Sequence, residues 1–267
     1  MPASKRADLR QRLGEIVHDA GALALTTFQR ASLKSWTKAH SSPVSEADIA
    51  VNDFLRERLA AAAPGAAWMS EETDDDLART AATCVWIVDP IDGTRAYIAG
   101  RADWSIAVAL TEHGRPSLAA IYAPVSGELF LAAAGAGATL NGARVNVSGG
   151  GDLGGARIAG PQSNLKRLAA LSPRIVAEPK VHSLALRLAR VAQGRFEAAF
   201  ASKNGHDWDL AAADLLVHEA GGALTDFSGR ALTYNLPHPV HGALIAAGQA
   251  RHGTLIDLVH DRQSEFV

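Results

Sequence analysis

The chain has 267 residues, of which 48% are hydrophobic and 20% are charged, so it holds enough apolar surface for a large core and is not a wholly disordered protein. Its 26 basic and 28 acidic residues give a net charge of −2, which excludes the overall basic field expected of a nucleic-acid-binding protein. The single cysteine excludes an internal disulfide, and no apolar run approaches the ~20 residues of a membrane-spanning helix, so we expect a cytoplasmic protein with no membrane or nucleic-acid partner.

Two helices are predicted in the first quarter of the chain. Apolar side chains recur at spacings of three and four from Leu9 to Leu23, which is the period of a helix with one buried face. A second helix is predicted to begin after Ser45, where Asp48 can complete a capping box, and to end at Pro64-Gly65.

The middle of the chain is predicted to form a sheet. Residues 84–88 are an apolar run typical of a buried strand, and further β-prone runs follow at 104–110, 117–122 and 128–133. The pair Asn141-Gly142, set between apolar residues, predicts a two-residue hairpin.

A glycine-rich stretch at residues 149–155 is the predicted boundary between two halves. It matches the pattern G-x-G-x-x-G, but the strand-like residues 156–159 follow it where a dinucleotide-binding site requires a helix, so we interpret it as a linker. Strand-like and helix-like segments then alternate, with helices predicted over 182–193 and 210–220. The whole pattern indicates a mixed α/β or α+β fold in two halves.

The strongest candidate for chemistry lies at residues 86–94. A buried strand ends there in Asp89 and Asp92, and open α/β sheets place ligands at the carboxyl ends of their strands. Two close carboxylates raise each other's pKa unless a cation keeps them ionised, and oxygen ligands suit Mg²⁺. Gly93 allows the backbone to approach closely, and a helix opening at Thr94 would offer N–H groups to an anion. The alternative is a strand followed by an acidic helix cap.

Two further segments could complete such a site. Glu71 follows a short apolar run and can leave the end of a strand. Asp209 is predicted at the start of a helix, beside Trp208 and ahead of alanines that permit close packing. Taken singly, the first is more often an acidic loop and the second a helix cap.

Together these segments resemble the inositol monophosphatase superfamily of Mg²⁺-dependent, lithium-sensitive phosphomonoesterases. The resemblance spans nearly the whole chain, with both family signatures in the right order: Ser42 to Asp48, Ser70 to Glu72, Asp89 to Thr94, Gly127 to Phe130, Leu140 to Gly142, and Trp208-Asp209. It implies an α+β fold, layered as an α/β/α/β/α sandwich, and a homodimer. Residues 1–267 would form one catalytic unit, with the metal motif in the half 1–150 and the Trp-Asp motif in the half 151–267.

The resemblance also implies the metal ligands. Glu71, Asp89 and the carbonyl of Ile91 would hold one Mg²⁺, and Asp89, Asp92 and Asp209 would hold a second. Glu71 could reach a third ion through water, so two or three Mg²⁺ are expected. Such ions lower the pKa of a bound water and stabilise the departing oxygen, so the reaction needs no covalent enzyme intermediate.

The remaining roles follow from the same resemblance. Asp48 and Thr94 would orient and help deprotonate the attacking water, with Glu71 as the third catalytic residue. Asp48 could also be a capping-box residue, and both roles are compatible. The substrate phosphate would lie on the metals and on the N–H groups of Gly93 and Thr94, with Asp209 also binding substrate.

Substrate choice depends on fewer residues. Inositol-specific members carry a glutamate seven residues before the aspartate that matches Asp209; here that position is Ser202, and the next residue, Lys203, favours a second anionic group. We therefore favour a 3'(2'),5'-bisphosphate nucleotidase that removes the 3'-phosphate of phosphoadenosine phosphate, although Lys203 could equally be a solvated surface residue. The segment from His182 to Ala185, with Ser183 as the substrate-binding residue, lies where the family contacts the organic part of the substrate, although it could equally be the start of an amphipathic helix. His40 stands where related bacterial enzymes often carry an aspartate, which would weaken the third-ion site.

Three alternatives stay open. The substrate could be inositol 1-phosphate, a related sugar or polyol phosphate, or histidinol phosphate. The protein could be a non-catalytic metal- or phosphate-binding relative, although the expected ligands and the Asp48–Thr94 pair are all present. The basic residues near the N-terminus could bind nucleic acid, although Asp8 and Glu15 interrupt them and no aromatic platform accompanies them.

Overall fold

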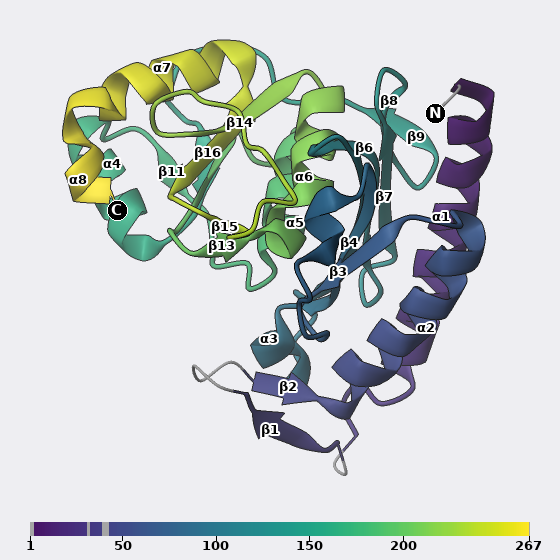
Figure 1. Cartoon of the computed structure of the whole chain (residues 1–267). Coiled ribbons are helices and arrows are strands. Elements are labelled where there is room, and N and C mark those ends of the chain that lie inside the picture. Colours follow the sequence, from purple (N-terminus) through teal and green to yellow (C-terminus); the bar gives the residue numbers. More distant parts are fainter. Residues whose placement is uncertain (1–2, 31–32, 39–42, 267) are drawn as a thin grey trace.

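The computed structural model describes residues 3–30, 33–38 and 43–266, and it arranges them in alternating layers of helix and sheet (Figure 1). The first layer contains α1 (Ala3–Leu25) and α2 (Glu46–Ala62), which pack side by side. A small hairpin of β1 (Ser35–Thr37) and β2 (Pro43–Ser45) lies beside them. Of the described helices, none is long and apolar enough to cross a membrane.

The second layer is a sheet in the strand order β3-β4-β5-β6-β7-β8-β9. Only β3 and β4 are parallel among its described pairs, and the others are antiparallel. Its strands are β3 (Ala67–Ser70), β4 (Cys84–Asp92), β5 (Ser105–Glu112), β6 (Arg115–Ala123), β7 (Glu128–Ala133), β8 (Gly137–Leu140) and β9 (Ala143–Val145). The turns η2 (Ala78–Ala81) and α3 (Thr94–Ile98) flank β4 in the chain.

The third layer contains α5 (Leu184–Ala192) and α6 (Asp207–Glu219), which pack against each other. The fourth is a sheet in the order β11-β10-β12-β16-β14. Its strands are β10 (Arg157–Ala159), β11 (Val176–Ala177), β12 (Ala198–Ala201), β14 (Gly222–Asp226) and β16 (Leu244–Gly248). The fifth layer contains α4 (Gln162–Leu171), α7 (Gln249–Val259), η3 (His260–Arg262) and α8 (Gln263–Phe266). A short pair, β13 (Gly205–His206) with β15 (Val240–His241), lies at the start of α6.

Each sheet packs against a helical layer on both of its faces, because successive side chains of a strand point to opposite faces. In β4, Trp86 and Val88 pack with α1 and α2, whereas Val85 and Ile87 pack with α5 and α6. In β12, the odd-numbered alanines face α5 and α6, and Phe200 faces α7 and α8. The result is the α/β/α/β/α sandwich implied by the resemblance.

Several local predictions are confirmed. Ser45 and Asp48 form the expected capping box at the start of α2, with the Ser45 N–H 2.8 Å from Asp48 Oδ2. Asn141 (φ 48°) and Gly142 (φ 83°) connect β8 to β9 in the left-handed conformations of a two-residue hairpin turn. Residues 149–155 are a connection leading into strand β10 and open no helix, so their interpretation as a linker is confirmed.

Candidate active site

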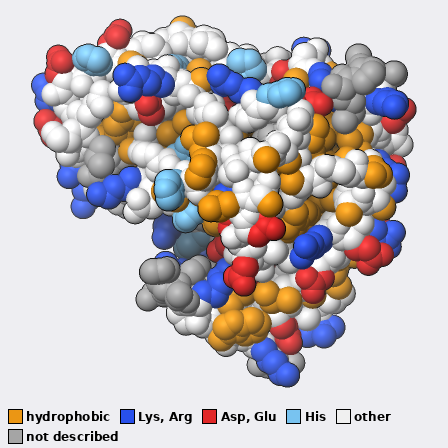
Figure 2. Space-filling view, viewed as in Figure 1, with side chains coloured by type: hydrophobic (Ala, Val, Ile, Leu, Met, Phe, Trp, Pro, Cys, Tyr) orange, Lys and Arg blue, Asp and Glu red, His pale blue; other side chains and the backbone are white. Residues whose placement is uncertain are grey.

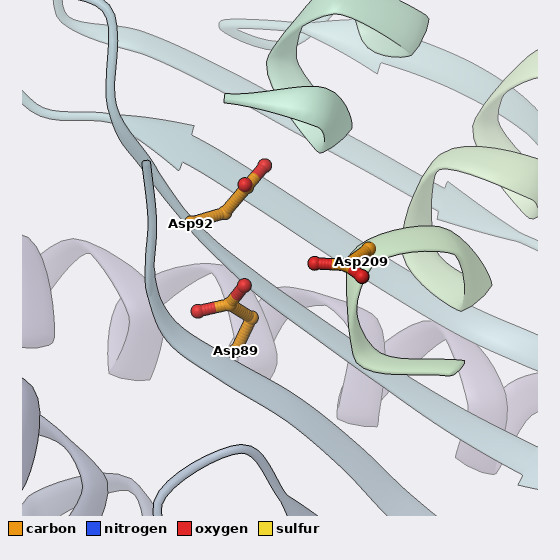
Figure 3. Close-up of side chains that lie close together, drawn as sticks. All are labelled: Asp89, Asp92 and Asp209. Atoms are coloured by element: carbon orange, nitrogen blue, oxygen red, sulfur yellow. The ribbon is translucent and has the colours of Figure 1, made fainter. Parts of the chain in front are cut away.

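The site begins with an irregularity in β4. This strand continues past the predicted residues 84–88 and ends at Asp92. Asp89 pairs with Ala107 and Asp92 with Ser105, so three steps along β4 oppose two along β5. In a regular strand, residues three apart point to opposite faces, whereas a bulge turns one of them back. The bulge therefore lets both carboxylates reach the same side (Figure 3).

The backbone turns sharply immediately after Asp92. Gly93 has φ +95°, a conformation that side-chain-bearing residues rarely adopt. A Cβ at this position would lie 3.2 Å from the backbone nitrogen of Ser183. Glycine thus permits both the turn and the close approach of the segment before α5, and α3 begins at Thr94 as predicted.

Asp209 comes from a different layer and meets these two carboxylates. It lies in the first turn of α6, where its Oδ2 accepts a hydrogen bond of 2.7 Å from the backbone N–H of His206. Ala211 to Ala213 are buried and let the helix pack closely against the sheets. Oxygen atoms of Asp89, Asp92 and Asp209 lie within 4.8 Å of one another (Figure 3).

Glu71 approaches from the end of β3. Because β3 runs parallel to β4 with Ser70 opposite Val88, Glu71 leaves its strand at the level of Asp89. The Nζ of Lys38 lies 3.5 Å from Glu71 Oε1 and 2.6 Å from Glu72 Oε1. Lys38 was not predicted as a site residue, because it stands in a polar segment thirty-three residues before Glu71 with no local pattern to mark it.

Burial makes this carboxylate cluster costly to ionise. Removal from water raises the pKa of Asp89, Asp92 and Asp209, and their mutual repulsion raises the pKa of Asp89 and Asp209 further. Burial likewise raises the pKa of Glu71 to about 7, although Lys38 opposes this shift. A set of buried carboxylates that offers only oxygen ligands and whose members repel one another fits a hard divalent cation such as Mg²⁺.

Asp48 makes both contacts that the sequence left open. Its Oδ2 accepts the capping hydrogen bonds of Ser45, and its Oδ1 accepts a 3.0 Å hydrogen bond from Thr94 Oγ1. Thr94 Oγ1 also lies 3.0 Å from the carbonyl oxygen of Ile91, so its one proton is shared between two acceptors. Burial raises the pKa of Asp48 to about 6.

The structure corrects the role expected for Ser183. Its side chain is buried at the start of α5, where Oγ donates to Asp92 Oδ2 at 2.6 Å and accepts from the Leu186 N–H at 2.9 Å. The Ser105 hydroxyl oxygen also lies 2.9 Å from Ser183 Oγ. With these partners the hydroxyl holds the carboxylate of Asp92, and Ser183 does not itself line the cavity.

The expectation for Lys203 also changes. A cavity of about 360 Å³ lies over the carboxylates, and the exposed Lys203 is absent from its lining. Its basic lining residues are Arg95, Lys180 and His182. Figure 2 shows basic and histidine side chains at the edge of a recess beside the β1–β2 hairpin.

Asp103 holds one of these lining residues in place. Its Oδ2 lies 2.6 Å from His182 Nδ1 and accepts the His182 backbone N–H at 2.8 Å. Asp103, Lys180 and Arg95 were not predicted as site residues, although Arg95 directly follows the motif. His40, the residue expected to weaken a third-ion site, lies outside the described residues.

Comparison with known proteins agrees with this architecture. Residues 7–264 match the inositol monophosphatase family. A histidinol-phosphatase of Chlorobaculum parvum is 34% identical over 228 residues, covering 81% of this chain and 85% of that protein. The Nus factor SuhB of Pseudomonas aeruginosa is 33% identical over 223 residues, covering 79% and 82%. The solved structure of an IMPase from Thermotoga maritima superposes with a TM-score of 0.83 at 25% identity, over 95% of this chain and 97% of that one. The chain therefore belongs to the inositol monophosphatase family and is a hydrolase of phosphate monoesters.

Proposed function

We propose that the protein is a Mg²⁺-dependent phosphatase whose metals are held by Glu71, Asp89, Asp92, Asp209 and the carbonyl of Ile91. The observation that carries this proposal is the convergence of three carboxylates, from two layers of the fold, within 4.8 Å. When bound, Mg²⁺ acts as a Lewis acid that stabilises charge on the phosphoryl group and lowers the pKa of water. The side chains and backbone of this chain would orient the attacking water, accept its proton and bind the phosphate.

Thr94 and Asp48 are proposed to take a proton from the attacking water. When the Thr94 hydroxyl donates to Asp48 Oδ1, the lone pairs of Thr94 Oγ1 are free to accept a hydrogen bond from water. A pKa of about 6 leaves Asp48 largely ionised at neutral pH, yet basic enough to accept the proton. The Ser45 capping bonds keep the Asp48 carboxylate in this orientation.

The phosphate is proposed to lie on the backbone N–H groups of Gly93 and Thr94 at the turn into α3. Gly93 is essential to this arrangement, because a side chain there would meet the backbone of Ser183. Asp209, which also lines the cavity, would contact the substrate as well.

The rest of the cavity favours a substrate with a second anionic group. Lys180 and Arg95 line the cavity beyond the carboxylates, beside His182, so its outer part carries two basic side chains. A second phosphate would be attracted there, whereas an ammonium group would be repelled. We therefore propose a 3'(2'),5'-bisphosphate nucleotide as the substrate, with Lys180 in the role that the sequence suggested for Lys203.

Histidinol phosphate is the second candidate, since a relative covering 81% of this chain is a histidinol-phosphatase. Its ammonium group would have to avoid the cationic residues that favour a bisphosphate. Lys180 would therefore favour binding of the bisphosphate and oppose binding of histidinol phosphate.

The homodimer, the cytoplasmic location and the two-half division stay predictions.

Phosphate release from a substrate panel tests the proposal. The panel contains 3'-phosphoadenosine 5'-phosphate, histidinol phosphate, inositol 1-phosphate and fructose 1,6-bisphosphate, each with Mg²⁺ and with EDTA. We expect Mg²⁺-dependent preference for the bisphosphorylated nucleotide, a raised KM for it in Lys180→Gln, and an unchanged KM in the control Lys203→Gln. Preference for histidinol phosphate, or equal effects of the two lysine variants, would contradict the substrate assignment. Full activity in EDTA would contradict the metal assignment.

A further inference from the structure

A network of hydrogen bonds outside the cavity surrounds the start of α6. Asp207 is fully buried there, two residues before Asp209. Its backbone N–H donates to the Pro239 carbonyl at 3.0 Å. Its Oδ1 lies 2.7 Å from His241 Nε2, and its Oδ2 accepts the Asn235 backbone N–H at 2.7 Å. The segment 235–241 therefore fixes both the backbone and the carboxylate of Asp207.

Asn235 connects this segment to the chain that follows Glu71. Its Oδ1 accepts from Arg79 Nη1 at 2.8 Å, and its Nδ2 donates to the Arg79 carbonyl at 2.9 Å. Arg79 is 3% exposed, and its Nε and Nη2 donate to both carboxylate oxygens of Asp75 at 2.8 and 2.6 Å. Asn235 itself has φ 62°, a left-handed conformation that asparagine tolerates better than most residues.

The network joins two layers that each supply part of the carboxylate cluster. Glu71 follows β3 of the seven-stranded sheet, whereas Asp209 begins α6 of the central helical layer. The bonds of Asn235 hold the segment after β3 against the start of α6, so they span the separation between Glu71 and Asp209. We infer that Arg79, Asn235 and Asp207 are positioning residues that set this separation and thereby the metal affinity. This inference rests on the proposed metal centre, and none of the three lines the cavity.

Asn235→Gly is the variant that weakens the connection, leaving the 3.2 Å bond from Arg79 Nη1 to the Leu236 carbonyl. Glycine keeps the left-handed backbone and the N–H that Asp207 accepts, and removes only the side-chain bonds to Arg79. Asn141→Gly is the matched control: Asn141 is also left-handed, and its side chain also makes two bonds, to the Leu129 N–H and the Gly127 carbonyl, in a hairpin that contributes none of the carboxylates.

Binding of Mn²⁺ to the metal-free full chain is measured by electron paramagnetic resonance of the free ion, together with the Tm of each protein in EDTA. We expect Asn235→Gly to weaken Mn²⁺ binding on the order of tenfold, as loss of residues that orient ligands does in other metal sites. Asn141→Gly should lower the Tm without changing Mn²⁺ affinity. Equal Mn²⁺ affinity in Asn235→Gly and wild type would overturn the inference and leave the metal centre standing. Failure of the wild-type protein to bind Mn²⁺ would overturn both.

Discussion

Replacing Ser183 by alanine separates the role shown by the structure from the substrate contact expected from the sequence. The Ser183 hydroxyl caps α5 through the Leu186 N–H and donates to the carboxylate of Asp92. Loss of a helix cap costs about 1 kcal/mol, and loss of a hydrogen bond to a charged group costs about 1.5–3 kcal/mol. Ala185 still donates its N–H to Asp92 Oδ2 at 2.6 Å, so the carboxylate keeps one partner.

The expected loss in the free energy of unfolding is therefore about 2.5–4 kcal/mol, measured by urea denaturation in EDTA at pH 7.5. Asp92 becomes less well oriented, so the Mg²⁺ concentration for half-maximal phosphate release should rise by about tenfold. KM for substrate at saturating Mg²⁺ should change little, because Ser183 is buried and does not line the cavity.

Ser105→Ala provides a graded control. Ser105 contacts the Ser183 hydroxyl and leaves the Ser183–Asp92 bond in place, so its effects on stability and Mg²⁺ requirement should be smaller. If Ser183→Ala raises KM at saturating Mg²⁺ while stability and Mg²⁺ requirement stay at wild-type values, Ser183 is a substrate ligand and does not act by orienting Asp92.

Three other substitutions test the site and its surroundings. Asp89→Asn should abolish phosphate release and, because it removes one of several buried repelling charges, raise the Tm in EDTA; retained full activity would exclude Asp89 as a metal ligand. Thr94→Ala should lower kcat while Mn²⁺ affinity stays close to that of the wild type, and an equal loss in both would argue against a proton relay to Asp48. Burial raises the pKa of Asp214 from its ordinary 3.8 to about 6 although the hydroxyl of Tyr234 donates to it at 2.9 Å. The folded state therefore binds the Asp214 proton more tightly, and the stability it contributes below pH 4 should be lost as pH rises through 6, by up to about 3 kcal/mol. The other buried carboxylates with a raised pKa also contribute to the decline in stability measured by urea denaturation in EDTA from pH 4 to 7.5. Asp214→Asn should therefore make this decline smaller by up to about 3 kcal/mol, and an unchanged decline would refute the assignment.

Local patterns in the sequence were sufficient for most elements and for the core of the candidate site. Two examples are the capping box of Ser45 and Asp48 and the turn at Asn141-Gly142. Each depends on residues at most three apart, so each can be predicted from the sequence alone. Asp89 and Asp92 were found in the same way, as acids at the end of an apolar strand. Asp209 was a helix-start residue that could complete the site, and the family resemblance then made it a metal ligand.

The direction in which each side chain points could be known only from the packed layers. Nothing local shows that the Ser183 hydroxyl turns toward Asp92, ninety-one residues earlier in the chain, or that Lys38 reaches Glu71. Lys203 stands close to Asp209 in sequence yet lies outside the cavity, whereas Lys180 lines it. Periodicity and capping determine where helices and strands form, because those interactions join near neighbours in the chain. The contacts between polar groups form when the two sheets pack against α5 and α6. Burial removes these groups from water, so each needs a hydrogen-bond partner, and that partner can be distant in sequence.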